Sequence, residues 1–374
     1  MKIQSSLRLL VIAIFLLSAS LPGCAGTTSP AILPTPTETA TVTPVPTDIP
    51  SPAATAIRTP PALSAMFVTA RLNPLDTPHT YIQEPCQYLH DKWSSTNSAP
   101  GTVVMVIMFH SIASEETTDP NQIIQGNFET LMNDLHEQGF QAINTQQLAD
   151  FLDHNASIPP RSVVLLVDDR HHAEYFNGYF RDYWENWGWP VVNAFISFPD
   201  NTQALWDENA SQEAEGFVDH QAHGVVHNIP IGPDSSDEYI LGELNGSITA
   251  FQQHFNKIPL AIIWPGGGFT PHAAELAHGS GYRLGFTINP RGPLMFNWVP
   301  LSDTSDPMRP SYIPEGAVND PLMVLPRYWA PDAAAHIDTV RLIGKEAAAY
   351  AEQNKLVELE YYDISCATRF GPMP

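Results

Sequence analysis

Six short apolar runs alternate with segments of helical periodicity, and this alternation restricts the folds open to the chain more than any other feature. The apolar runs span residues 103–109, 163–167, 191–197, 259–263, 284–288 and 321–325. Runs without polar alternation are typical of strands that are buried on both faces of a sheet. The helical segments are expected at 127–138, 145–153, 174–187, 238–255, 271–280 and 332–352. This order predicts a mainly parallel α/β sheet wrapped by helices, either a barrel or a doubly wound sheet.

Two further segments have a clear pattern, one typical of a buried helix and one typical of a loop. In the first helical segment, Phe128, Leu131, Leu135 and Phe140 follow the three-to-four spacing of one buried helix face. Residues 301–320 are instead rich in Pro, Ser and Asp, and we expect a long surface loop of the kind that can line a cleft.

An acidic pair and a histidine pair are the candidate functional residues. Asp168 and Asp169 end the second apolar run, where both side chains can turn toward a pocket at the carboxyl ends of the strands. His223 and His227 are four residues apart, so one helical turn would place both rings on the same side. One carboxylate and two imidazoles leave a divalent ion with open positions for water and substrate, as in catalytic zinc sites. The pattern predicts such a site with a second carboxylate beside it.

Each pair also has a simpler explanation. The chain contains 14 His, so a pair at this spacing is expected somewhere by chance. Two Asp at a strand end often cap a helix or form a turn. The order of the motifs along the chain is what favours the metal site.

Four segments carry that order, at residues 103–112, 167–170, 218–227 and 262–268, followed by residues 281–287. They contain His110-Ser111-Ile112, Asp168-Asp169, the histidine pair, Trp264-Pro265-Gly266 and Gly281-Tyr282. In this order they resemble the Tyr-His-Ser-Ile, Thr-Phe-Asp-Asp-Gly, histidine, Tyr-Pro-Tyr-Gly and Gly-Tyr motifs of the polysaccharide deacetylase (NodB-homology) family. The resemblance is to the branch that acts on poly-N-acetylglucosamine, and it extends from about residue 100 to about residue 330.

The resemblance implies a fold, a reaction and a set of roles. The fold would be an irregular (β/α)7-type barrel with its active site at the carboxyl ends of the strands. Asp168 would be the general base, and Asp169, His223 and His227 would hold a divalent metal, for which we expect zinc. The reaction would remove N-acetyl groups from a glycan, with O-acetyl esters as an alternative. His110 belongs to the first motif and is expected near the substrate.

The chain departs from the family at several positions. Arg170 replaces the Gly of the Asp-Asp motif, and it would either orient Asp168 or obstruct the cleft. The Arg that steers the base in the third motif is missing, and Arg327 or Arg170 would have to replace it. No Leu-x-His motif supplies a general acid, and His336 lies in an expected helix. A second interpretation therefore stays open, in which the protein binds glycan with the fold intact but without turnover.

Glycines and tryptophans provide further candidates for substrate binding. The run that begins at Gly266 would let backbone N–H groups approach an oxyanion, although it would equally form a tight turn. A sugar also needs aromatic walls, and we expect most of the candidate indoles to pack in the core instead. The candidates are Trp184, Trp187, Trp189, Trp264, Trp298 and Trp329.

The amino-terminal part predicts a tethered, secreted protein. Lys2 and Arg8 precede a short apolar stretch, and Gly23 stands directly before Cys24. Residues 1–23 are therefore expected to be a lipoprotein signal peptide, with Cys24 carrying the lipid. Residues 24–62 form a Thr- and Pro-rich linker, which we expect to be a disordered, extended stalk. Residues 63–374 would form the catalytic domain, anchored by lipid at the outer face of the membrane.

Charge and cysteine content restrict the partners and the compartment. The formal net charge is −23, and loss of residues 1–23 makes it more negative. Such a surface disfavours nucleic acid and anionic lipid, so we expect contact with the membrane only through the lipid. We also expect a monomer. With Cys24 assigned to lipid, Cys86 and Cys366 remain, and an oxidising compartment favours a disulfide over two free thiols.

Overall fold

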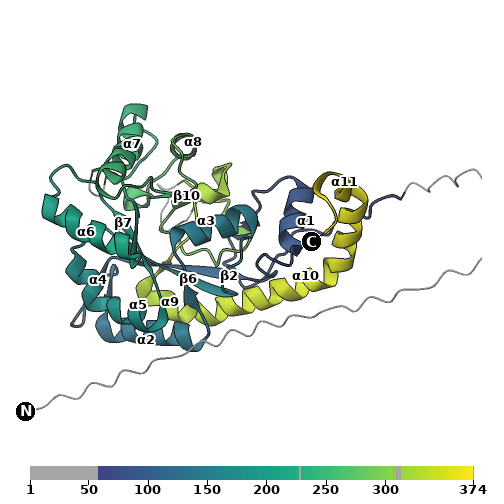
Figure 1. Ribbon diagram of the computed structural model, residues 1–374, viewed down its shortest axis with the longest axis horizontal. Coiled ribbons are helices and arrows are strands. Elements are labelled where there is room, and N and C mark those ends of the chain that lie inside the picture. Colours follow the sequence, from purple (N-terminus) through teal and green to yellow (C-terminus); the bar gives the residue numbers. More distant parts are fainter. Residues whose placement is uncertain (1–57, 227–228, 306, 308–312, 374) are drawn as a thin grey trace, which may run out of the picture. The chain divides into compact units, whose positions relative to one another are not determined.

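The computed structural model describes residues 58–226, 229–305, 307 and 313–373 (Figure 1). The expected signal peptide, the lipidated Cys24, most of the stalk and His227 lie outside the described residues. Within the described part of the chain, no helix combines the length and the apolar character needed to cross a membrane.

A parallel sheet forms the centre of the domain. Its strands, in spatial order, are β10 (Leu284–Phe286), β9 (Ala261–Ile263), β8 (Val218–Ala222), β7 (Val191–Phe195), β6 (Arg161–Asp168), β2 (Val103–Phe109) and β12 (Tyr328–Trp329). The short β5 (Gln141–Ala142) pairs with the start of β6. Every pairing within this sheet is parallel.

One short segment links the two edges of this sheet. Leu325 accepts a hydrogen bond from Thr287 (2.9 Å) and donates one to Gly285 in β10 (2.7 Å). Three residues later, Tyr328 pairs with Ile107 in β2. The sheet therefore curls so that β10 and β12 come together, and the predicted irregular α/β barrel is confirmed.

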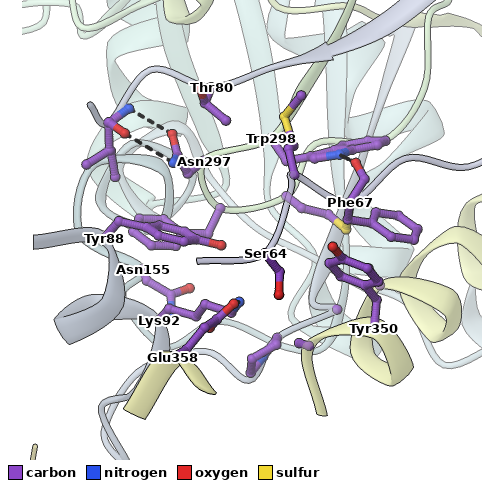
Figure 2. A pocket seen from close by; sticks show the side chains of 18 of the residues that line it. Ser64, Phe67, Thr80, Tyr88, Lys92, Asn155, Asn297, Trp298, Tyr350 and Glu358 are labelled. Carbon is purple, nitrogen blue, oxygen red and sulfur yellow. Dashed lines mark hydrogen bonds and ion pairs between the residues drawn. The ribbon is translucent and has the colours of Figure 1, made fainter. Parts of the chain in front are cut away.

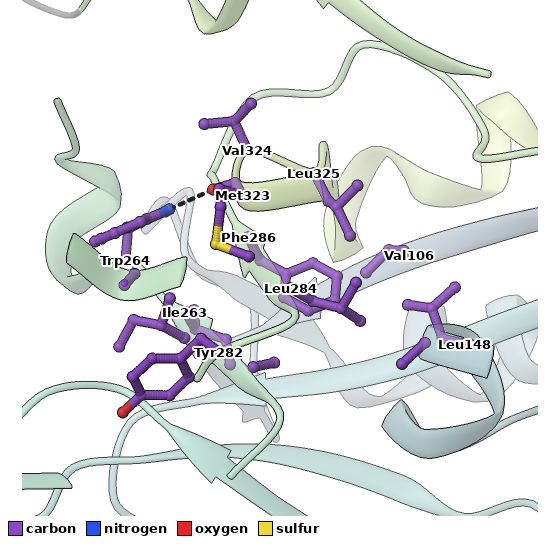
Figure 3. Packing of buried hydrophobic residues seen from close by; sticks show 14 of the residues in the cluster. Val106, Leu148, Ile263, Trp264, Tyr282, Leu284, Phe286, Met323, Val324 and Leu325 are labelled. Carbon is purple, nitrogen blue, oxygen red and sulfur yellow. Dashed lines mark hydrogen bonds between the residues drawn. The ribbon is translucent and has the colours of Figure 1, made fainter. Parts of the chain in front are cut away.

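Both faces of the central strands are covered by apolar side chains. Alternate residues of β2 and β6 belong to two separate clusters: Val104, Val106, Val164 and Leu166 in one, and Val103, Met105, Val163 and Leu165 in the other. Figure 3 shows part of the first cluster, where Val106 lies near Leu148, Leu284 and Leu325. This two-sided burial explains why the runs lack polar alternation.

Most of the expected helices are present, with shifted ends. They are α2 (Gln125–Glu137), α3 (Thr145–His154), α7 (Asp237–His254), α8 (Pro271–Gly279) and α10 (Ile337–Ser365). Phe128, Leu131 and Leu135 are buried on α2, as predicted, whereas Phe140 is buried after the helix has ended. The segment expected at 174–187 is divided into α4 (Ala173–Tyr179) and α5 (Arg181–Trp187), with Phe180 at the junction.

Two expectations about the remaining elements are wrong, and several elements were not expected. Pro321–Met323 is a 3₁₀ helix and not a strand, since Pro321 has no N–H to donate to a ladder. The stretch 301–320 is not only surface loop, because Glu315 is fully buried and the stretch begins within β11 (Val299–Ser302). β8 and α6 (Gln203–Glu215) were not among the expected elements. The other elements are α1 (Pro85–Trp93), α9 (Ala330–Ala333), α11 (Ala367–Phe370), β1 (Asp76–His79), which pairs with β11, and the pair β3 (Ser111–Ala113) and β4 (Gln122–Ile124).

The two ends of the domain meet beside α10. A disulfide joins Cys86 in α1 to Cys366, which follows the last turn of α10. Figure 1 shows α1 beside the carboxyl end of α10. Nearby, a cavity of about 280 Å³ opens at the amino end of β2. Figure 2 shows Tyr88, Tyr350 and the ion pair of Lys92 with Glu358 around it. This cavity lies at the other end of β2 from His110.

Candidate functional site

The candidate residues gather at the carboxyl ends of the barrel strands. Asp168 is the last residue of β6, and His110 directly follows β2. The pairing of Phe109 with Val167 makes these two residues neighbours. His223 directly follows β8. In parallel α/β folds this end of the sheet is where ligands bind.

Asp168 forms a buried ion pair with Arg327. The two side chains are 2% and 0% exposed, and Arg327 Nη1 donates to Asp168 Oδ1 at 2.5 Å. Burial raises the pKa of the Asp168 carboxyl, but Arg327, His223 and His110 together outweigh it and hold that pKa below its ordinary value. Asp168 is therefore a carboxylate near neutral pH, as a proton acceptor must be.

Arg327 is held in place by the segment that follows β10. Its Nε donates to the carbonyl of Thr287 at 2.6 Å, and its backbone N–H donates to the carbonyl of Asn289 at 3.1 Å. Arg170, the other expected steering residue, is exposed and donates to Asn201 Oδ1 at 2.7 Å. Of the two candidates, Arg327 is the one that contacts Asp168.

His110 faces the second oxygen of Asp168. Its Nε2 lies 3.7 Å from Asp168 Oδ2, and a quarter of the side chain is exposed. The ring stacks on the indole of Trp329, with centroids 5.8 Å apart, and the indole N–H donates to the carbonyl of Ile288 at 3.0 Å. Trp329 therefore fixes the plane of a partly exposed imidazole beside the buried carboxylate.

Asp169 and His223 form the described part of the expected metal site. Asp169 has a left-handed backbone (φ 72°), and its Oδ1 lies 3.9 Å from His223 Nε2. The carbonyl of Asp169 accepts a hydrogen bond from Asn193 Nδ2 at 3.0 Å. His223 Nδ1 lies 2.8 Å from the carbonyl of Ile263, which fixes the tautomer with its proton on Nδ1. The lone pair of Nε2 is then free to bind a cation.

These two residues fit a divalent metal. A ligand imidazole ordinarily donates its other ring N–H to a carbonyl or carboxylate, as His223 does to Ile263. Among the described residues, no group of three or more His, Cys, Asp and Glu side chains is arranged to hold an ion. The third expected ligand, His227, lies outside those residues.

Trp264 does not form a wall for the substrate, and this prediction is wrong. Its side chain is 0% exposed, and its indole N–H donates to the carbonyl of Met323 at 2.8 Å (Figure 3). Trp184, Trp187, Trp189 and Trp298 also pack in or against an apolar cluster. Of the six candidate indoles, Trp329 is the one in contact with a candidate site residue, His110.

The glycine run forms a tight turn. Pro265–Gly267 is a single 3₁₀ turn in which Gly266 and Gly267 have φ of 57° and 72°. A Cβ on Gly267 would lie 2.6 Å from Ile288, so close packing requires glycine there. Gly266 is exposed. The turn explanation accounts for the run, and a role of Gly266 at an oxyanion stays a prediction.

Two residues with a place in this site were not singled out from the sequence. Asn193 is fully buried and holds the carbonyls of Val167 and Asp169, on either side of Asp168. A lone Asn within the apolar strand Val191–Phe195 was the available signal. Glu243 on α7 binds the loop after His223, and nothing in its helix distinguishes it from a surface residue.

Comparisons with known proteins give one relative and several solved structures, while no family model matches the chain. The relative is the Bacillus subtilis protein named "Putative polysaccharide deacetylase YxkH", which is 21% identical over 186 residues. The match covers 50% of this chain and 64% of that protein, so this chain spans just under two thirds of its relative.

The solved structures include two bacterial proteins. The Streptococcus pyogenes deacetylase PplD in complex with acetate has a TM-score of 0.49 and 15% identity, with 64% of this chain and 98% of that one covered. IcaB from Ammonifex degensii has a TM-score of 0.49 and 14% identity, with 64% and 97% covered. The functional argument for this chain therefore depends on the geometry of its own site.

Proposed function

We propose that this protein is a metal-dependent hydrolase that removes N-acetyl groups from a glycan. The observation that carries the proposal is the buried carboxylate of Asp168, ion-paired with Arg327 and directly beside the Asp169–His223 pair. The name of the Bacillus subtilis relative, a putative polysaccharide deacetylase, supports the same reaction class. The acidic surface suits a neutral or cationic glycan better than an anionic polymer.

Asp169, His223 and His227 would hold the metal, for which we propose zinc. A bound divalent ion polarises an amide carbonyl and lowers the pKa of its water to about 7. His223 is prepared for this role because its Nδ1 is already engaged by Ile263. Asp169 reaches toward the same point from a loop that Asn193 fixes.

Asp168 would accept a proton from the attacking water. Arg327 engages Oδ1, so Oδ2 is the oxygen left to receive the proton. Oδ2 faces His110, whose ring is partly exposed and fixed by Trp329. We propose that His110 donates a proton to the departing amine, which is the role that the missing Leu-x-His motif would otherwise supply.

The alternative of a glycan-binding protein without turnover is not favoured by this geometry. Its support was Arg170 in place of Gly, the missing steering Arg and the missing general acid. Arg170 instead binds Asn201, and Arg327 contacts the base.

Acetate release from an oligomer of N-acetylglucosamine tests the proposal. We expect the zinc-loaded protein to release acetate, and Asp168→Asn to reduce the rate by at least about 100-fold, the usual contribution of a general base. Zinc content should be unchanged in this variant, and the exposed Asp200→Asn should behave as wild type. Equal rates for Asp168→Asn and wild type would exclude Asp168 as the base.

We also propose that Cys24 carries a lipid that anchors the domain at the outer face of the cell membrane. The support is the apolar stretch and the small residue before Cys24. Mass spectrometry of the membrane-extracted protein should show a diacylglycerol adduct that Cys24→Ala lacks. An unmodified Cys24 in that fraction would contradict the proposal.

A further inference from the structure

Glu243 is a buried carboxylate whose partners, within the described part of the chain, are backbone N–H groups. It lies on α7 and is 3% exposed. Its Oε2 accepts hydrogen bonds from the N–H groups of Val225 (2.7 Å) and Val226 (3.0 Å), and its Oε1 also accepts from Val226 (3.2 Å). These two N–H groups lie between the expected metal ligands His223 and His227 in the sequence.

Gly224, directly before these N–H groups, packs closely against the Glu243 carboxylate. Gly224 has φ of 76°, and a Cβ on it would lie 2.4 Å from Glu243 Oε2 and 2.9 Å from Pro265 Cγ. Successive N–H groups that follow a left-handed residue form a concave site for an anion. Glu243 fills this site, so the loop adopts its course around the Glu243 side chain.

A second contact from α7 reaches the same loop. Gly246 lies one turn after Glu243, and a Cβ on it would lie 2.7 Å from Val225 Cγ2. Ser247 Oγ donates to the carbonyl of Glu243 at 2.9 Å. α7 therefore holds Val225 through both a carboxylate and a close approach. Among the described residues, no Lys, Arg or His forms an ion pair with Glu243.

We propose that Glu243 is a positioning residue for the metal site, and that it sets metal affinity by fixing the backbone that directly follows His223. This inference rests on the proposed function. Ile263 fixes the His223 ring, whereas Glu243 fixes the direction in which the chain leaves His223. A loop ordered beforehand loses less conformational freedom when the ion binds, which strengthens binding.

Zinc affinity of the full-length protein, measured by competition with a chromogenic chelator after metal removal, tests this role. We expect Glu243→Gln to weaken zinc binding by about 10- to 100-fold, the usual effect of removing a group that supports a ligand. Glu238→Gln on the exposed side of α7 is the matched control and should bind zinc as wild type does. A merely structural role would lower the unfolding temperature of the metal-free protein and leave zinc affinity unchanged.

Gly246→Ala provides a second variant in case Glu243→Gln does not fold. The added methyl group would displace Val225 without changing any charge, so we expect weaker zinc binding in a folded protein. If a folded variant binds zinc with wild-type affinity, the role of Glu243 is overturned, while the proposed function still stands. If the wild-type protein itself binds neither zinc nor another divalent ion, the proposed function fails, and this inference fails with it.

Discussion

The buried pair of Arg327 and Asp168 sets the charge balance at the carboxyl ends of the strands. Both side chains are buried, and Arg327 Nη1 contacts Asp168 Oδ1. A buried pair gains little stability relative to apolar residues, but removing one partner leaves an uncompensated charge. The positive charge that Arg327 brings close to Asp168 therefore matters for both folding and reactivity.

Replacing Arg327 by Ala should damage both properties. We expect the free energy of unfolding to fall by about 3–5 kcal/mol, because Asp168 would be left buried without its cation. Acetate release should also fall, because the base loses its fixed orientation. Urea unfolding and the acetate assay measure the two effects. Arg170→Ala should change stability by no more than about 0.5 kcal/mol, and an equal loss in both variants would contradict the role of Arg327.

At the residue scale, the sequence identified site residues that lie in motifs, but it missed most of the residues that hold them in place. The Asp168-Asp169 pair ends an apolar run, so its place at the carboxyl end of a strand could be inferred from the sequence. His223 was joined to this pair only through the order of the motifs, because β8 has no apolar run. Arg327 emerged only as a replacement for a missing family residue. Trp264 was misplaced because an indole at a strand end can face either a cleft or the core. Glu243 could not be predicted, since its partner is backbone that sequence does not locate.

β8 shows how a buried element can escape prediction. Its residues Asp219, His220 and Gln221 are polar, so the strand lacks an apolar run. Each has a partner within the fold: Lys257 Nζ binds Asp219 at 2.8 Å, and Gln221 Oε1 accepts from the N–H groups of Leu260 and Ala261. Tertiary hydrogen bonds thus replace the hydrophobic pattern on which strand prediction depends.

His220 gives this strand a dependence on pH. It is fully buried, with Nδ1 3.1 Å from Glu213 and Nε2 2.9 Å from Asn209, and its ring stacks on Phe255. Burial lowers the pKa of His220, and the contact with Glu213 offsets only part of this effect. Since the unfolded chain then binds more protons below about pH 6.5, folding becomes less favourable as pH falls below that value.

We expect the free energy of unfolding to fall by up to about 1.4 kcal/mol per pH unit below about pH 6.5. Urea unfolding of wild type and His220→Gln at about pH 7.5 and about pH 5.5 measures this loss of stability. The other titratable groups are the same in both proteins, so the difference between the two pH effects isolates His220. Wild type should lose more stability than the variant on acidification, and equal losses would contradict this assignment.

At the scale of the whole molecule, the segment that closes the barrel also supplies residues of the site. The segment that bridges β10 to β2 runs from Leu325 to Trp329, and it carries both Arg327 and the indole that stacks on His110. The alternation of runs predicted an α/β sheet, but it did not distinguish a barrel from an open sheet. Whether the sheet closes depends on β12, which has only two residues and is too short to give a periodic signal in the sequence.

The disulfide acts at the opposite end of the molecule from this segment. It joins residues that are 280 apart in the sequence and ties α1 to the end of α10. Such a crosslink restricts the unfolded chain, so the double variant Cys86→Ala, Cys366→Ala should be about 2–5 kcal/mol less stable to urea.

Because the crosslink lies beyond the amino end of β2, it should stabilise the fold without shaping the site. Zinc affinity and acetate release per folded molecule should therefore match wild type, while reductant should destabilise wild type and leave the double variant unaffected. Reductant that destabilises both proteins equally would mean that the disulfide is not the source of the effect. A loss of zinc affinity in the folded double variant would instead show that the crosslinked end of α10 is coupled to the far end of the barrel.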